Sequence, residues 1–154
     1  MNAEKYVFEL HGYLKALQRL CGTNYAFGAR FYSKKEDLDT FGQKISEKKL
    51  KYEEADHVSI FKNIESMVFN GFLAKEHVPN ERAWNYLTKV IIEDINEYFG
   101  LVSLALNEDG IFHPLLNGII YKNIAPFEKD KASLIFWIEI EQHYVLAYFR
   151  NINR

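Results

Sequence analysis

The closing segment of the chain, ASLIFWIEIEQHYVLAYFRNINR, constrains the fold most, because it can be a single helix or a hairpin of two strands. A helix would give it an apolar and a polar stripe, but Glu141 would then fall on the apolar face. A hairpin would turn at Glu141 and Gln142, although these residues lack the Asn-Gly or Asp-Gly signal that two-residue loops prefer. Branched and aromatic residues dominate the segment, so we predict the hairpin.

The predicted hairpin has two unlike faces, because side chains alternate along a strand. One face is almost entirely apolar and suited to cover helices; it collects Leu134, Phe136, Ile138, Ile140, Val145, Ala147 and Phe149. The other face pairs Glu139 with Tyr144, Trp137 with Leu146, and Ile135 with Tyr148. We expect this mixed, aromatic face to be partly exposed.

Helical spacing of apolar residues marks the first two thirds of the chain. Helices are predicted from Val7 to a stop at Gly22, from a cap at Asp56, and from a cap at Asn80 to a stop at Gly100. A further short helix begins at the capping-box pair Ser33 and Glu36 and is interrupted around Gly42. Residues 25–32 are expected to be extended, and the charged run KISEKKLKYEEAD to be a solvated helix face or loop.

From Leu101 onward the chain is rich in branched and aromatic residues and is punctuated by Gly and Pro, a texture typical of strands. Helices followed by strands predict an α+β fold, with N-terminal helices packed on a C-terminal antiparallel sheet that ends in the hairpin. Residues 1–154 have the length of one globular domain.

The net charge and the cysteine content indicate the cellular compartment and the class of partner. The formal net charge of −2 provides no global positive field for a polyphosphate backbone, so no nucleic-acid partner is expected. A single cysteine, Cys21, suits a reducing compartment. The N-terminus lacks the pattern of a signal peptide, and no apolar run is long enough to span a membrane. We therefore expect a cytoplasmic protein without a membrane partner.

The sequence provides little support for catalysis. On a hairpin, Glu139 and Glu141 point to one face and His143 to the other, which makes a shared metal site geometrically poor, whereas a helix would place Glu139 and His143 on one face. Cys21 lies on the buried face of a helix and is a poor nucleophile. Motifs for phosphate binding or a nucleophilic serine are missing from the sequence. We expect no catalytic residue, metal or cofactor, and an enzyme is the less favoured class.

Binding to another protein is the favoured interpretation, because aromatic residues make up 16% of the chain and are common at interface centres. The most concrete form is a bacterial immunity or inhibitor protein that neutralises a toxin, such as a nuclease, by direct binding. The predicted partner-binding residues are Trp137, Glu139, Glu141, Tyr144 and Tyr148. The alternative is a small-ligand-binding or hydrolytic α+β domain with a pocket between sheet and helices. A homodimer would use the same aromatic face.

Overall fold

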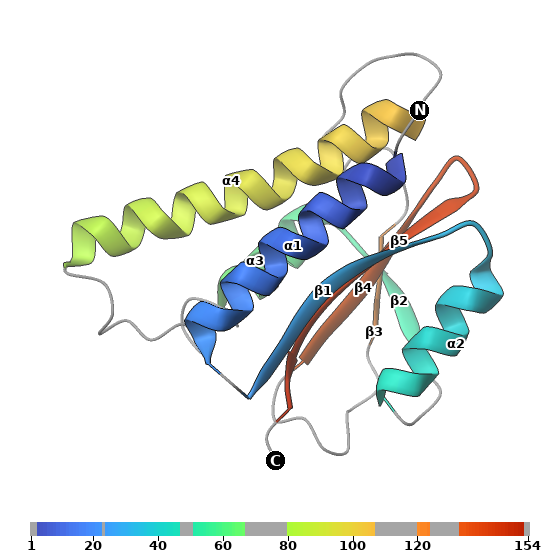
Figure 1. Ribbon diagram of the computed structural model, residues 1–154, viewed down its shortest axis with the longest axis horizontal. Helices are drawn as coiled ribbons and strands as arrows, with labels where there is room; N and C mark the ends of the chain where they lie inside the picture. The colour runs from blue at the N-terminus through green and yellow to red at the C-terminus, as the bar shows by residue number, and fades with distance from the viewer. Residues whose placement is uncertain are drawn as a thin grey trace.

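The computed structural model describes residues 3–22, 24–46, 51–66, 80–106, 120–123 and 133–152. Four helices and five strands are present in this part of the chain (Figure 1). In chain order they are α1 (Ala3–Cys21), β1 (Tyr25–Tyr32), α2 (Lys35–Ser46), β2 (Tyr52–Ala55), α3 (His57–Ile64), α4 (Glu81–Leu106), β3 (Ile120–Asn123), β4 (Ser133–Ile140) and β5 (His143–Asn151). Together they confirm the predicted α+β class.

The sheet has the strand order β1-β5-β4-β3-β2, and every neighbouring pair is antiparallel. The hairpin of β4 and β5 is confirmed, with Glu141 and Gln142 at its turn and Glu139 opposite Tyr144, as predicted. Both turn residues have positive φ, 49° and 62°. Positive φ at both central positions defines the type I′ turn, whose twist matches that of the flanking strands.

One face of the sheet is covered by α1, α3 and α4, which lie on the same side of it in Figure 1. The apolar face of the hairpin is part of this core, as predicted, and Phe136 and Phe149 are fully enclosed there. Helix α1 contributes Leu10 and Leu14, and α4 contributes Ile95, at the apolar spacing seen in the sequence. The removal of so much apolar surface from water is the main source of stability of this layer.

The second face of the sheet is covered by α2, which among the described helices is the one that packs on this side (Figure 1). Leu38 of α2 is fully buried against Ile135 and Leu146, and Phe41 and Ile45 add to the contact. The expectation that this face is partly exposed is therefore wrong at its centre. The physical reason is that the helix after β1 crosses to the side of the sheet that the other helices leave open.

The predicted caps of α3 and α4 and the predicted stop of α1 are confirmed. Asp56 caps α3 by accepting a hydrogen bond from the Ser59 N–H at 2.7 Å, and Asn80 caps α4 by accepting one from the Ala83 N–H at 2.8 Å. Gly22 follows α1 with a φ of 121°, a backbone conformation suited to glycine. The first described helix therefore ends where the sequence indicates.

One predicted interruption, one predicted helix end and the prediction for the second part of the charged run are wrong. Helix α2 runs through Gly42, and α4 continues past Gly100 to Leu106 because Phe99, Val102 and Ala105 are buried in the core, which outweighs the low helix propensity of glycine. The end of the charged run forms β2, which pairs with β3. Predictions that concern residues 67–79, 107–119 and 124–132 lie outside the described residues.

The outer edge of β1 is capped by side chains of α1. The Phe27 N–H donates to Gln18 Oε1 at 2.8 Å, and the Ala29 N–H donates to His11 Nδ1 at 3.1 Å. His11 and Gln18 lie two helical turns apart on α1, and the two strand residues are separated by one pleat. These two hydrogen bonds hold α1 against the edge of β1. They also satisfy backbone N–H groups that could otherwise pair with another strand.

Candidate functional site

The five predicted partner-binding residues do not share one surface. Trp137 and Tyr148 are only 5% and 7% exposed, because α2 packs over them. Glu139 and Tyr144 are half-buried, and Glu141 is exposed at the hairpin turn. Their role in binding a partner remains a prediction, and the three accessible residues are the ones that can contact a partner while α2 stays in place.

Trp137 is held in an aromatic cluster inside the protein. Its ring stacks on Tyr121 with the ring centroids 4.2 Å apart and meets the edges of Tyr52 and Tyr144 at 5.6 and 5.8 Å. The Lys35 Nζ atom lies 4.9 Å from the Trp137 ring centroid, within the range of a cation–π interaction. These aromatic side chains therefore contribute to the internal packing between α2 and the sheet.

The accessible end of the hairpin is acidic. Tyr144 lies opposite Glu139, and desolvation together with the negative charges of Glu139, Glu36 and Asp39 raises the pKa of the Tyr144 hydroxyl. We call Glu139, Glu141 and Tyr144 the hairpin patch. It presents one aromatic ring beside carboxylates, but it is small.

The histidine of the hairpin turn has a local structural role. His143 Nδ1 lies 2.8 Å from the Glu141 carbonyl oxygen, and its ring stacks on Phe31 with the centroids 5.5 Å apart. Among the described residues, no three His, Cys, Asp or Glu side chains are grouped so that they could hold a metal ion. Burial raises the pKa of the Cys21 thiol to about 12, so this sulfur is not a thiolate at neutral pH.

A second acidic and aromatic surface lies between α1 and α4, where the two helices pack side by side (Figure 1). A groove of about 300 Å³ opens there and is lined by Glu9, Tyr13, Asp94, Glu97, Tyr98 and Leu101. The Tyr13 hydroxyl donates a hydrogen bond to Asp94 Oδ2 at 2.8 Å, and the Tyr13 and Tyr98 ring centroids are 5.7 Å apart. We call this the acidic groove.

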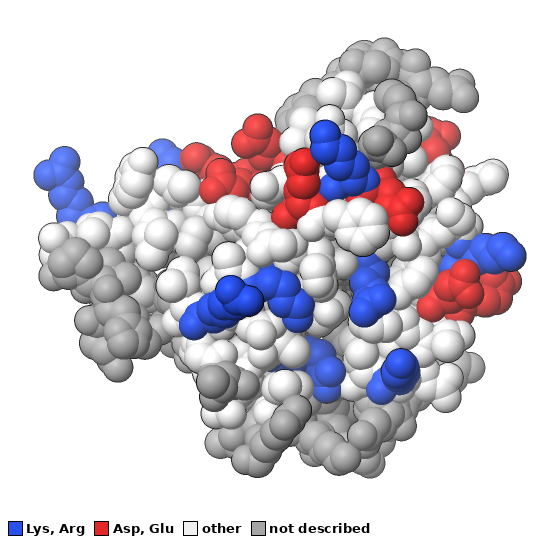
Figure 2. All heavy atoms as spheres, in the orientation of Figure 1, with Lys and Arg blue, Asp and Glu red and all other residues white. Residues whose placement is uncertain are grey.

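The acidic groove carries a concentrated negative potential. Burial, followed by the hydrogen bond to Asp94 and its charge, raises the pKa of Tyr13. Burial and then the charges of Glu9, Asp94 and Glu97 raise the pKa of Tyr98. Both tyrosines therefore remain neutral donors beside three carboxylates. Figure 2 shows acidic side chains gathered along this side of the molecule, over α1 and α4.

Sequence reasoning missed the acidic groove because its two walls are far apart along the chain: Tyr13 and Asp94 are separated by 81 residues. A signal was nevertheless present. Glu9 and Tyr13 have the spacing of one helix face, and so do Asp94, Glu97 and Tyr98. Each helix thus carries a polar and aromatic stripe, but only the packing of α1 on α4 brings the stripes together.

Comparison of this chain with protein-family models, curated proteins and solved structures gives no match. None of the described helices is long and apolar enough to cross a membrane.

Proposed function

We propose that this chain is a non-enzymatic protein-binding module of the immunity type, which neutralises a bacterial toxin by direct binding. The observation that supports the proposal is the acidic groove, in which Glu9, Asp94 and Glu97 surround two tyrosines. A toxin that acts on nucleic acid carries a basic active site, and an acidic, aromatic surface is complementary to such a site in charge and in chemistry.

The partner is a protein with Lys and Arg side chains at its binding surface. Arg is well suited to this groove, because its planar guanidinium can bind a carboxylate through two hydrogen bonds and stack on a tyrosine ring. The groove offers both kinds of contact within about 300 Å³. The hairpin patch is a second contact surface of the same character.

Co-production tests this function directly. Cells that make a candidate nuclease toxin should grow when they also make this protein, and the two should purify as a one-to-one complex. We expect the triple variant Glu9→Gln, Asp94→Asn, Glu97→Gln to weaken binding about tenfold or more, because the loss of even one charge-assisted hydrogen bond costs about 1.5–3 kcal/mol. Added salt should weaken the native complex more than the variant complex.

A matched control removes the same number of charges elsewhere. Glu53, Glu54 and Glu81 are exposed on β2 and α4 and take no part in the acidic groove. Their triple change to Gln should leave the affinity within about twofold of the native value. Equal affinities of the two triple variants would refute the acidic groove as the binding surface. The change Tyr144→Ala with Glu139→Gln and Glu141→Gln tests the hairpin patch in the same assay.

A further inference from the structure

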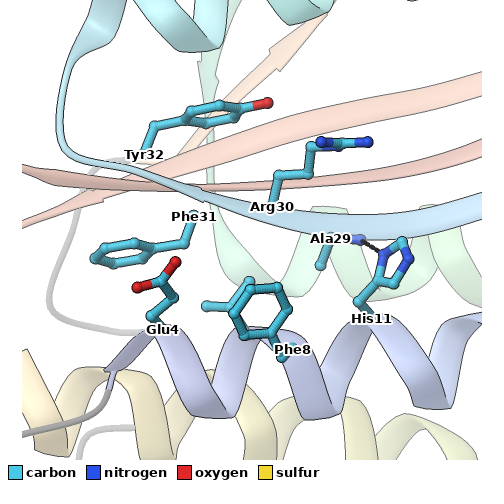
Figure 3. A pocket seen from close by; sticks show the side chains of 8 residues that line it. Glu4, Phe8, His11, Ala29, Arg30, Phe31 and Tyr32 are labelled. Carbon is cyan, nitrogen blue, oxygen red and sulfur yellow. Dashed lines mark hydrogen bonds between the residues drawn. The ribbon is translucent and has the colours of Figure 1, made fainter.

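A separate groove of about 350 Å³ runs along the outer edge of β1, beside the N-terminal half of α1 (Figure 3). The side chains of Arg30 and Tyr32 leave the strand on the α2 side, whereas Ala29 and Phe31 face α1. From α1, the side chains of Glu4, Phe8 and His11 rise toward the strand and complete the lining together with Val7. A ligand in this groove would lie along the edge of the sheet.

The strand edge offers a hydrogen-bond donor to such a ligand. The N–H groups of Phe27 and Ala29 point away from β5, since both donate to α1 side chains. N–H directions alternate along an antiparallel strand, so the Phe31 N–H points to the same side. No side chain of the described residues accepts a hydrogen bond from it, and Phe31 lines the groove.

One end of the groove is cationic, and no carboxylate of the described residues forms an ion pair with its cations. Within the described part of the chain, the ion pairs are Lys35–Asp39 and Lys89–Glu93, and neither Arg30 nor Lys15 takes part in one. Burial and the charge of Arg30 lower the pKa of Lys15. Figure 2 shows Lys and Arg side chains, without acidic neighbours, over the C-terminal half of α1 and over β1.

His11 adds a directed donor at the same end. Its Nδ1 atom accepts the Ala29 N–H, so the ring proton resides on Nε2, which is a donor. At the other end, Glu4 lies two turns of α1 away, which corresponds to about 10 Å. Between the ends, Phe8 is 68% exposed, and the Phe31 ring lies toward the Glu4 end of the groove (Figure 3). The groove therefore has a cationic end, an apolar wall and an anionic end.

We propose that this groove binds an amido carboxylate with a large apolar side chain, either a free N-acylated amino acid or the C-terminal residue of a peptide. The carboxylate contacts Arg30 and the His11 Nε2–H, while Lys15 adds positive charge nearby. The apolar side chain packs on Phe8 and Phe31, and the amide carbonyl accepts from the Phe31 N–H. Glu4 repels the carboxylate and so fixes its direction.

This site is independent of the acidic groove, since its lining shares no residue with that groove. Its ligand is an anion, whereas the proposed toxin presents cations to the protein. The failure of one proposal therefore leaves the other standing.

Titration with N-acetyl-phenylalanine, followed by amide chemical shifts of the labelled protein, tests the proposal. We expect saturable shifts in α1 and β1 with a Kd of about 1 mM, the range of a small ligand in an open groove. N-acetyl-phenylalanine amide, which lacks the carboxylate, should bind at least about fivefold more weakly. A tripeptide with a C-terminal Phe distinguishes the two sources: tighter binding of the tripeptide than of the free compound indicates a peptide terminus, and equal binding indicates a free ligand.

Two variants and one control make the test specific. Arg30→Gln removes the cation, and Phe8→Ser removes an exposed ring that contributes little to folding; each should weaken binding about fivefold or more. Lys89→Gln, on the exposed side of α4, removes one positive charge outside the groove and should leave the Kd unchanged. Equal binding of the acid and its amide, shifts outside α1 and β1, no saturable shift, or identical affinities of Arg30→Gln and Lys89→Gln would each overturn the proposal.

Discussion

Glu141 and Gln142 hold the hairpin turn in a backbone conformation that neither residue prefers. Both have positive φ, which costs an L-residue other than Gly about 1–2 kcal/mol. The double change Glu141→Asn, Gln142→Gly supplies the residues that a type I′ turn favours, so the free energy of unfolding should rise by about 1 kcal/mol and Tm by about 3 °C. Thermal and urea unfolding measure both. A lower Tm than that of the native protein, or than that of a Gln142→Ala control, would contradict the assigned turn.

His11 makes the stability of the protein dependent on pH. Burial, followed by the charges of Lys15 and Arg30, lowers its pKa below the usual value of 6.5. The unfolded chain therefore binds a proton more readily than the folded protein, so the free energy of unfolding falls as the pH drops through the unfolded pKa toward the folded one. The stabilisation is complete above about pH 6.5.

The change His11→Gln isolates this effect, because the Gln amide oxygen can still accept the Ala29 N–H but does not titrate. Urea unfolding at a series of pH values should show that the native protein loses stability relative to the variant as the pH falls from 7 to about 5. A constant difference between the two proteins over this range would show that His11 does not titrate on unfolding.

Among the elements, α2 determines which residues on the second face of the sheet are accessible to a partner. Leu38 is fully buried and anchors this helix on the second face. The change Leu38→Ala should lower the free energy of unfolding by about 2–5 kcal/mol, because it removes buried apolar groups and leaves a cavity. In a Trp84→Phe background, the emission of Trp137 should also shift to longer wavelength as water reaches the aromatic cluster.

Val58 provides the comparison for this experiment, since it is an apolar helical residue that is 49% exposed. The change Val58→Ala should alter the free energy of unfolding by about 0.5 kcal/mol or less, as measured by urea unfolding. A loss for Leu38→Ala no larger than this would mean that α2 contributes little to the packing of the second face.

Over the whole molecule, the sequence predicts what depends on local periodicity and misses what depends on packing. Alternation fixed the register of Glu139 with Tyr144 and the apolar face of the hairpin. The burial of Trp137 depends instead on a helix that starts about a hundred residues earlier. The net charge of −2 is the sum over an acidic side along α4 and a basic region over β1 (Figure 2). Composition alone therefore predicts neither groove.

The strand order has a consequence for synthesis on the ribosome. The hairpin of β4 and β5 lies inside the sheet, yet it is the last part of the described chain to be made. Until it emerges, β1 lacks β5, its neighbour among the described strands, and the apolar sides of α1 and α4 lack the two long strands that they cover. The nascent chain therefore passes through a long interval with exposed apolar helices, in which a chaperone has a surface to bind. Folding is completed only when the final hairpin is inserted between the strands that preceded it.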